Sequence, residues 1–149
     1  MFVYRIALEK YTHQLLSPGT EARWNSKGNF VIYTAASRAL ACLENIVHRD
    51  SEGLKALFKV MIIDIPDSVS IQEINVKNLP VDFPNTSTLH ITRQMGNNWL
   101  YAQKTAVLKV PSAIIKGESN YLLNPAHSQF KKIKIKALED FEFDNRLKS

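Results

Sequence analysis

The chain has 149 residues, of which 45% are hydrophobic and 22% are charged, as in ordinary soluble globular domains. These values argue against a disordered or fibrous protein, and the length predicts a single domain over residues 1–149, because a chain of this size buries one core. The formal charge of +5 favours an anionic ligand or an acidic partner without choosing between them.

Membrane insertion, export and metal binding have no support in the sequence. The apolar run at 107–115 is broken by a lysine and a proline and is far shorter than the roughly 20 residues that span a bilayer. The N-terminal segment lacks a signal-peptide pattern, and Cys42, the only cysteine, is typical of a reducing compartment. We therefore expect a cytoplasmic protein without membrane association. The four histidines lie far apart, so no metal site is predicted.

Short runs rich in β-branched and aromatic residues recur along the chain, and such runs predict strands. The predicted strands are 2–8, 30–35, 57–65, 106–115 and 130–138, with a weak strand or turn at 71–74. The segment 17–29 is rich in turn residues and predicts an irregular loop, with room for a short paired segment at 22–25.

Two helices are predicted. Ser37 is placed to cap a helix over residues 37–48, and a shorter helix is expected over 97–105, where Trp99 lies on the apolar face. The prolines within 78–90 predict a loop that continues as irregular structure to about residue 97. Strands outnumber helices and do not alternate regularly with them, so we predict an α+β domain with a curved mixed or largely antiparallel sheet.

A basic segment near the C-terminus has two interpretations. Residues 130–138 alternate isoleucines with Lys132, Lys134 and Lys136, as in a half-buried edge strand whose lysines lie in solvent. The alternative is a basic RNA-binding surface of a non-catalytic interaction module. Stacking aromatics between the lysines would favour that reading, and only Phe130 lies nearby.

Glu44 is the residue whose position most needs an explanation. At about 100° per residue, Glu44 falls in the same narrow helical arc as Leu40, Leu43 and Val47, which predicts that it faces the core side. A carboxylate taken out of water costs several kcal/mol unless it is paired or hydrogen-bonded. The sequence must therefore supply a partner or a function for Glu44.

Three interpretations of Glu44 stay open on spacing alone. It can form a structural ion pair with Arg23, or it can accept hydrogen bonds from backbone N–H groups of a loop. It can also join Arg23 and Tyr33 in a nucleotide site, since a guanidinium binds phosphates, a tyrosine offers a flat face and a carboxylate accepts from ribose hydroxyls. Ser112 and Asn120, taken alone, have the patterns of turn residues.

The segment 22–48, ARWNSKGNFVIYTAASRALACLENIVH, resembles the signature of the RES domain family. In that signature an Arg-Trp-Asn and a glycine precede a strand that ends in Tyr-Thr, and a helix with Leu-Glu follows. The segments at 96–100, 106–114 and 118–127 recur in the family in the same order, so the resemblance covers nearly the whole chain.

The resemblance implies a fold like that of ADP-ribosyltransferases and a toxin of a type II toxin–antitoxin pair. Family members cleave NAD at the nicotinamide bond by hydrolysis or phosphorolysis, and some relatives ADP-ribosylate a protein. NAD is then a substrate, inorganic phosphate an optional co-substrate, and no separate cofactor is expected. The implied partner is an Xre-type antitoxin that carries any DNA-binding function, so direct DNA binding is not expected of this chain; a homodimer within the complex is compatible with the family.

The family's site residues fall on four positions of this chain. The resemblance implies that Glu44, Arg23 and Tyr33 are catalytic, and that Arg23 and Tyr33 also bind the substrate together with Ser112. Asn120 is a further candidate for substrate binding. If phosphate is the acceptor, additional cations should line the pocket, and the candidates are Lys27, Arg38 and Lys109.

Overall fold

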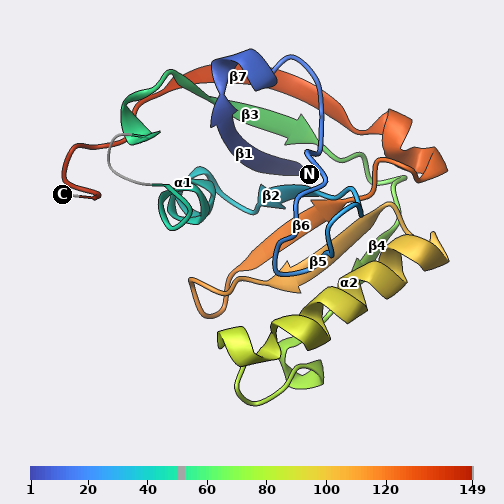
Figure 1. The fold of residues 1–149 in the computed structure, drawn as a ribbon. Coiled ribbons are helices and arrows are strands. Elements are labelled where there is room, and N and C mark those ends of the chain that lie inside the picture. The colour runs from blue at the N-terminus through green and yellow to red at the C-terminus, as the bar shows by residue number, and fades with distance from the viewer. Residues whose placement is uncertain (50–52, 149) are drawn as a thin grey trace.

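The computed structural model describes residues 1–49 and 53–148 (Figure 1). This part of the chain forms one seven-stranded sheet in the order β4-β5-β6-β2-β1-β3-β7. The strands are β1 (Phe2–Leu8), β2 (Ile32–Ala35), β3 (Phe58–Asp64), β4 (Ile71–Glu73), β5 (Val107–Pro111), β6 (Ser119–Leu123) and β7 (Lys134–Phe141). Only β4 and β5 pair in parallel, and the remaining pairs are antiparallel. The predicted α+β domain with a mixed sheet is confirmed.

Two α-helices and five short 3₁₀ helices accompany the sheet in the described residues. The α-helices are α1 (Arg38–Ile46) and α2 (Leu89–Ala102). The 3₁₀ helices are η1 (Glu9–Tyr11), η2 (Gly53–Lys55), η3 (Val76–Asn78), η4 (Thr86–Thr88) and η5 (Ser128–Lys132). Figure 1 shows α1 beside β1 and β2, while α2 runs along β5. Neither described helix is long and apolar enough to cross a membrane.

The strand register places both α-helices on the same face of the sheet. Directly paired residues share a face, and so do residues two apart along a strand. Tyr4 pairs with Ala35, which pairs with Asn120, and two residues further along β6 Leu122 pairs with Tyr33. The side chains packed under α1 and those packed under α2 therefore belong to one continuous face, with Tyr33 and Asn120 on it.

Each helix covers its own apolar cluster on this face. The cluster under α1 includes Leu40 and Ala41 of the helix with Ile6 and Val60 of the sheet. The cluster under α2 includes Trp99 and Leu100 of the helix with Trp24, Leu108, Val110 and Leu122. A third cluster, built around Val3, Ile32, Met61, Ile63 and Leu123, lies on the other face. Burying three such clusters supplies the main driving force for the fold.

The second helix differs most from its sequence-based prediction. It begins at Leu89 and ends at Ala102, so residues 89–96, which were expected to be irregular, form its first turns, and the expected end at 105 lies beyond it. Thr92 and Gly96 lower intrinsic helix propensity, but both are buried against the rest of the protein. Tertiary packing therefore decides the conformation of this segment.

Strand β6 was not predicted from the sequence, and it forms through its pairing with β2 and β5. The remaining predicted elements agree with the structure apart from their ends. The final strand begins at Lys134 because residues 128–132 form η5, and it continues to Phe141. Its lysines are exposed and it lies at the edge of the sheet, as expected for an edge strand. The tail folds back: Phe143 is buried against Phe58, and Lys148 donates to the backbone oxygen of Ile46 at the end of α1.

The buried face of α1 is rotated relative to the predicted arc. Leu40 and Ala41 are buried, Leu43 is half-buried, and Val47 is 53% exposed and lies just beyond the helix. The expectation that Val47 and Glu44 share a core-facing stripe is therefore wrong. Glu44 is half-buried at the border of the buried face, where its carboxylate can reach both protein partners and a ligand.

Candidate active site

The helix that carries Glu44 is fixed at both ends by polar contacts. At its start the Ser37 hydroxyl accepts a hydrogen bond from the Leu40 N–H at 3.1 Å, which is the N-cap predicted from sequence. One residue after Glu44, the Asn45 amide donates to the backbone oxygen of Ile6 in β1 at 2.6 Å. The helix is thus bound to the sheet next to the glutamate, which fixes where the carboxylate points.

Two polar side chains converge on one oxygen of the Glu44 carboxylate. The Asn120 amide donates to Oε1 at 2.7 Å, and the Ser112 hydroxyl donates to the same oxygen at 3.4 Å. Within residues 1–49 and 53–148, no group bonds the other oxygen, Oε2. The pair of contacts orients the carboxylate and leaves one oxygen available to accept a hydrogen bond or to face a developing positive charge.

Ser112 owes its position to a turn that follows β5. Its hydroxyl accepts from the N–H groups of Ile114 and Ile115 at 3.0 and 3.1 Å, and its own N–H donates to the Glu118 oxygen at 2.8 Å. The side chain is 6% exposed. Ser112 is therefore both the turn residue that its local pattern predicts and a contact of Glu44, since a hydroxyl can accept and donate at once.

Arg23 belongs to an irregular segment, residues 22–26, which we call the Arg23 segment. Hydrogen bonds of Tyr33 and Asn25 hold this segment in shape. The Tyr33 hydroxyl accepts from the Trp24 N–H at 3.1 Å and donates to the Asn25 side-chain oxygen at 2.5 Å. Asn25 in turn donates to the backbone oxygens of Thr20 and Asn29. Burial raises the pKa of Tyr33, so its hydroxyl stays protonated in this network. The Tyr33 hydroxyl is already used by the protein, and its ring is what remains to meet a ligand.

The first turns of α2 lie along the same irregular segment. The Thr92 hydroxyl donates to the Arg23 backbone oxygen at 2.7 Å, and the Asn97 side chain accepts from the Ser26 N–H at 3.1 Å. Between them, a Cβ at position 96 would lie 1.7 Å from the Trp24 backbone oxygen, so only glycine permits this approach. The Gly-Asn-Asn stretch of α2 therefore serves to position the Arg-Trp-Asn segment.

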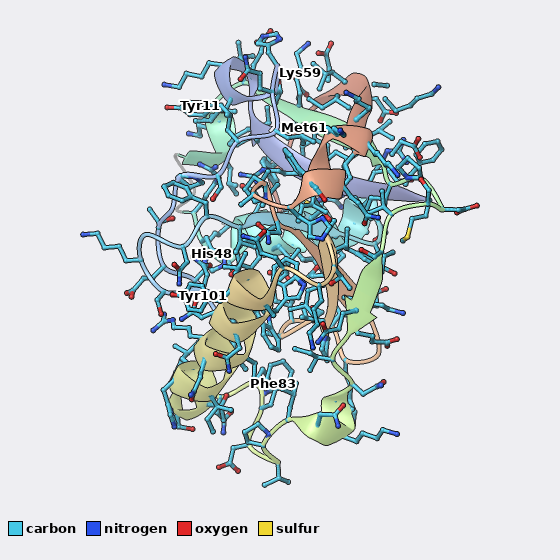
Figure 2. All side chains as sticks on the ribbon, turned by 90° about the vertical axis from the view of Figure 1, so that its right-hand side faces the viewer. Tyr11, His48, Lys59, Met61, Phe83 and Tyr101 are labelled. Atoms are coloured by element: carbon cyan, nitrogen blue, oxygen red, sulfur yellow. The ribbon has the colours of Figure 1, made fainter. Side chains whose placement is uncertain are left out.

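The Arg23 guanidinium reaches the site with part of its hydrogen-bonding capacity unused. Its Nη1 is buried and has no hydrogen-bond partner among the described residues, and its Cζ lies 5.6 Å from the centre of the Phe83 ring. Burial lowers the pKa of Arg23 and the Glu44 charge partly offsets this, but an arginine remains charged. Phe83 lies beside the N-terminal half of α2, far from Tyr101 at the other end (Figure 2).

The unused polar atoms concentrate in this region. In the described part of the chain, three buried side-chain nitrogen or oxygen atoms have no hydrogen-bond partner: Arg23 Nη1, Asn120 Oδ1 and Asn124 Nδ2. Asn120 bonds Glu44 directly, and Arg23 is near enough for the Glu44 charge to act on it. An unsatisfied buried donor or acceptor costs about 1–3 kcal/mol. A donor and an acceptor left open at one place indicate a site that a polar ligand completes.

The structure decides between the open interpretations of Glu44. No ion pair joins Arg23 to Glu44 in residues 1–49 and 53–148, so the structural ion pair is wrong, although the Glu44 charge acts on both Arg23 and Tyr33. The loop N–H groups bond Ser112 instead of Glu44. What the fold brings together is Glu44 with Asn120 and Ser112, and Arg23 with Tyr33, on one face of the sheet.

The expected additional cations are engaged elsewhere or stay unassigned. Arg38 pairs with Glu139 at 2.7 Å, and Lys109 lies 3.7 Å from Glu73. Lys27 is exposed on the loop after Arg23. Sequence reasoning missed Arg93 and Phe83, which both lie next to the Arg23 segment, because residues 78–97 were expected to be irregular. If a helix starting at residue 89 had been predicted, Thr92, Arg93 and Gly96 would have been placed close together on that helix.

Metal chemistry has no ligand set here: in the described residues, no group of three or more His, Cys, Asp or Glu side chains is arranged to hold an ion. The arrangement offers a carboxylate oxygen, a guanidinium and an aromatic face. These groups suit a ligand that carries phosphates, hydroxyls and a ring.

Comparison with known proteins gives a consistent result. The RES domain family matches residues 2–144. A Sphingobium protein named Prs ADP-ribosylating toxin is 38% identical over 97% of this chain and 94% of its own length. A Yersinia enterocolitica protein named Toxin Res is 34% identical over 99% of this chain and its own full length.

A solved structure shares the fold at low sequence identity. It is the crystal structure of the M. tuberculosis MbcT–MbcA toxin–antitoxin complex, in which one chain matches with a TM-score of 0.74 and 16% identity. The match covers 95% of this chain and 84% of the other. At this identity the likeness bears on the fold alone, and it agrees with the mixed sheet and two helices described above.

Proposed function

The chain belongs to the RES domain family, and from this premise we propose that it is a toxin enzyme that cleaves NAD at the nicotinamide–ribose bond. One observation carries the proposal. The Glu44 carboxylate is held through Oε1 by Asn120 and Ser112, while Oε2 has no hydrogen-bond partner among the described residues. Tyr33 lies on the same sheet face as Asn120, and Arg23 is near enough for the Glu44 charge to act on it.

The reaction needs charge stabilisation more than proton transfer. When the bond from the anomeric carbon to the pyridinium nitrogen breaks, its electron pair neutralises the ring, and nicotinamide leaves without a proton. The ribose carbon becomes cationic, like the oxocarbenium ion that glycosidases stabilise with carboxylates. Glu44 Oε2 supplies that negative charge and accepts hydrogen bonds from the ribose hydroxyls. This role accounts for a carboxylate with two hydrogen-bond donors on Oε1 and none from the described residues on Oε2.

The remaining residues bind and orient the substrate. Arg23 holds the pyrophosphate, which supplies acceptors for its buried unpartnered Nη1. The Tyr33 ring packs against the nicotinamide or its ribose, while its hydroxyl keeps the Arg23 segment in shape. Asn120 positions Glu44 and offers its open oxygen to an N–H or O–H of the substrate. Ser112 supports Glu44 and is close enough to the site to bond a ribose hydroxyl.

The acceptor defines the product. Attack by water on the ribose carbon, with loss of a proton, gives ADP-ribose, and attack by inorganic phosphate gives a phosphorylated ADP-ribose. Either reaction depletes NAD and stops growth. Both need the same carboxylate, so the residues named above serve hydrolysis and phosphorolysis alike.

The test measures free nicotinamide after purified protein is mixed with NAD, with and without inorganic phosphate. Glu44→Gln keeps the shape and the Oε1 acceptor but removes the charge, so we expect nicotinamide release to fall about 100-fold or more with little change in stability. Arg23→Ala should also lose release, through weaker substrate binding. Glu142→Gln, an equal charge change at an exposed position, is the control. Folded wild-type protein that releases no nicotinamide in either condition contradicts the proposal.

Transfer of ADP-ribose to a protein is a second candidate, favoured by the name of the 38% identical relative. The chemistry at Glu44 is the same, and only the nucleophile changes. Mass spectrometry of cell proteins after expression of the toxin would detect a modified target. The Glu44→Gln variant should leave the proteome unmodified while the wild type adds ADP-ribose to a defined protein.

We further propose a protein antitoxin of the Xre type as partner, in line with the toxin–antitoxin complex whose toxin chain shares this fold. The antitoxin blocks the site and carries the DNA-binding function, and the complex can contain two toxin copies. Co-expression of the gene next to this one should restore growth, and the two proteins should co-purify with nicotinamide release suppressed.

A further inference from the structure

Arg93 is a second arginine at the Arg23 segment, and nothing in the sequence motifs pointed to it. It lies in the first half of α2, where its Nε donates to the Ala22 backbone oxygen at 2.8 Å. Its neighbour Thr92 donates to the Arg23 backbone oxygen. The helix thus places the Arg93 guanidinium beside the residue that carries the Arg23 guanidinium, and the Nε bond leaves the two terminal nitrogens of Arg93 for another acceptor.

Among the described residues, the two arginines have one ion-pair contact between them, from Glu21 to Arg93. The acid nearest Arg93 is Glu21, whose Oε2 lies 4.0 Å from Nη1, beyond hydrogen-bond distance, and whose side chain is 63% exposed. A pair at that distance whose acid is mostly exposed contributes little. Arg93 lowers the pKa of Arg23, after the larger effects of burial and Glu44, so the two cations act on each other. Two cations that repel each other make a site for an anion with more than one charge.

We propose that Arg93 and Arg23 together bind the pyrophosphate group of NAD. The inference rests on the proposed function and adds a residue to it. The diphosphate carries two negative charges and several acceptor oxygens, which match two guanidiniums, each with terminal N–H groups to donate. Arg23 meets the phosphates with its buried unpartnered Nη1, and Arg93 meets them with its terminal nitrogens.

Removing the charge of Glu21 should affect diphosphate binding in the opposite direction to removing the charge of Arg93. Its carboxylate competes weakly with the substrate for Arg93, because both are anions near the same terminal nitrogens. Removing the Glu21 charge should tighten binding of a diphosphate, whereas removing the Arg93 charge should weaken it. A purely structural role of Arg93, acting through its bond to Ala22, predicts no benefit from the change at Glu21.

The experiment compares Arg93→Gln, Arg93→Lys and Glu21→Gln with wild type and with Lys104→Gln, an exposed control beyond the end of α2. Two quantities are measured: KM for NAD in nicotinamide release, and the affinity for ADP-ribose and for inorganic pyrophosphate by calorimetry. We expect Arg93→Gln to raise KM and weaken both ligands about tenfold, with kcat changed less. Arg93→Lys should keep part of the affinity, and Glu21→Gln should lower KM about threefold.

The outcomes separate this inference from the proposed function. Unchanged KM and unchanged ADP-ribose affinity in folded Arg93→Gln overturn the role of Arg93 and leave NAD cleavage standing. If wild type releases no nicotinamide but binds pyrophosphate in an Arg93-dependent way, NAD cleavage fails and the two-arginine site stands. Absence of pyrophosphate and ADP-ribose binding in the wild type overturns the two-arginine site.

Discussion

Glu44 stands on a regular helix, whereas Arg23 stands on an irregular segment whose only strand-like feature is the bridge between Ala22 and Asn25. The helix begins at a short-range signal, the Ser37 cap, and packs on the sheet through Leu40 and Ala41. The Arg23 segment is shaped by Tyr33 and by α2, which begins more than 60 residues later. The start of the helix that carries Glu44 therefore follows from local sequence, whereas the position of Arg23 depends on a helix that is distant in the chain.

The largest expected effect comes from separating α2 from the Arg23 segment. In Gly96→Ala the new methyl group would lie 1.7 Å from the Trp24 backbone oxygen, so the helix must move away. We expect a loss of about 3 kcal/mol or more in the free energy of unfolding, because overpacking against backbone cannot relax through a side chain. Urea unfolding measures this loss, and nicotinamide release should fall with it as Arg23 loses its position.

Asn98→Ala is the matched control for that substitution, since position 98 lies on the exposed side of the same helix. It should change stability by no more than about 0.5 kcal/mol and leave NAD turnover unchanged. If Gly96→Ala keeps both the stability and the turnover of the wild type, then α2 does not position Arg23, and Arg23 does not depend on distant contacts more than Glu44 does.

A smaller, more local effect is expected on the Glu44 side. Asn120→Ala removes the 2.7 Å hydrogen bond to Oε1 and frees the carboxylate to rotate. A hydrogen bond to a charged group contributes about 1.5–3 kcal/mol, so we expect kcat for nicotinamide release to fall about tenfold or more while α1 stays in place. The initial rate at saturating NAD measures the effect.

Asn124→Ala provides the comparison, because Asn124 follows the same strand, is 1% exposed, and is also a buried asparagine with an unpartnered side-chain atom. Both substitutions should lower stability, but only the change at Asn120 should lower kcat. Equal losses of kcat in the two variants would falsify a specific role for Asn120 in holding Glu44.

Elements that are set by local sequence could be predicted, and elements that depend on distant contacts could not. The β1, β2 and α1 elements and the Ser37 cap follow from local apolar patterns and from capping chemistry. The start of α2 could not be predicted, because Thr92 and Gly96 are poor helix formers. Both residues are needed for contacts with the Arg23 segment, which lies about 70 residues earlier in the chain.

Within the site, periodicity flagged Glu44 but assigned it the wrong neighbours. Val47 is exposed, and the contacts that matter come from Asn120 and Ser112, which the local patterns assign to turns. Only the family resemblance singled out Ser112, and neither pattern nor resemblance indicated Arg93. Long-range side-chain contacts of this kind leave no periodic signal, since each depends on strand register and helix placement together.

The smallest expected effect on turnover comes from Tyr33→Phe, which keeps the aromatic ring and removes the hydroxyl that bonds the Trp24 N–H and the Asn25 side chain. Losing the contacts to the Trp24 N–H and the Asn25 side chain should cost about 1–3 kcal/mol of stability. KM for NAD should rise several-fold through a more mobile Arg23, with kcat nearly unchanged. Tyr121→Phe, a buried tyrosine on the other face, is the control for hydroxyl removal.

The free energy of unfolding at alkaline pH gives an independent test of the Tyr33 hydroxyl. Burial raises the pKa of Tyr33 above the ordinary tyrosine value near 10, so the unfolded chain releases this proton at lower pH than the folded protein does. The contribution of Tyr33 to stability is complete below pH 10 and falls by up to about 1.4 kcal/mol per pH unit above it. Tyr33→Phe lacks this titration, so its unfolding free energy should decline less steeply between pH 10 and 11 than that of the wild type or of Tyr121→Phe. Parallel declines in all three proteins would mean that the Tyr33 hydroxyl reaches water, and Arg23 would then depend on α2 alone.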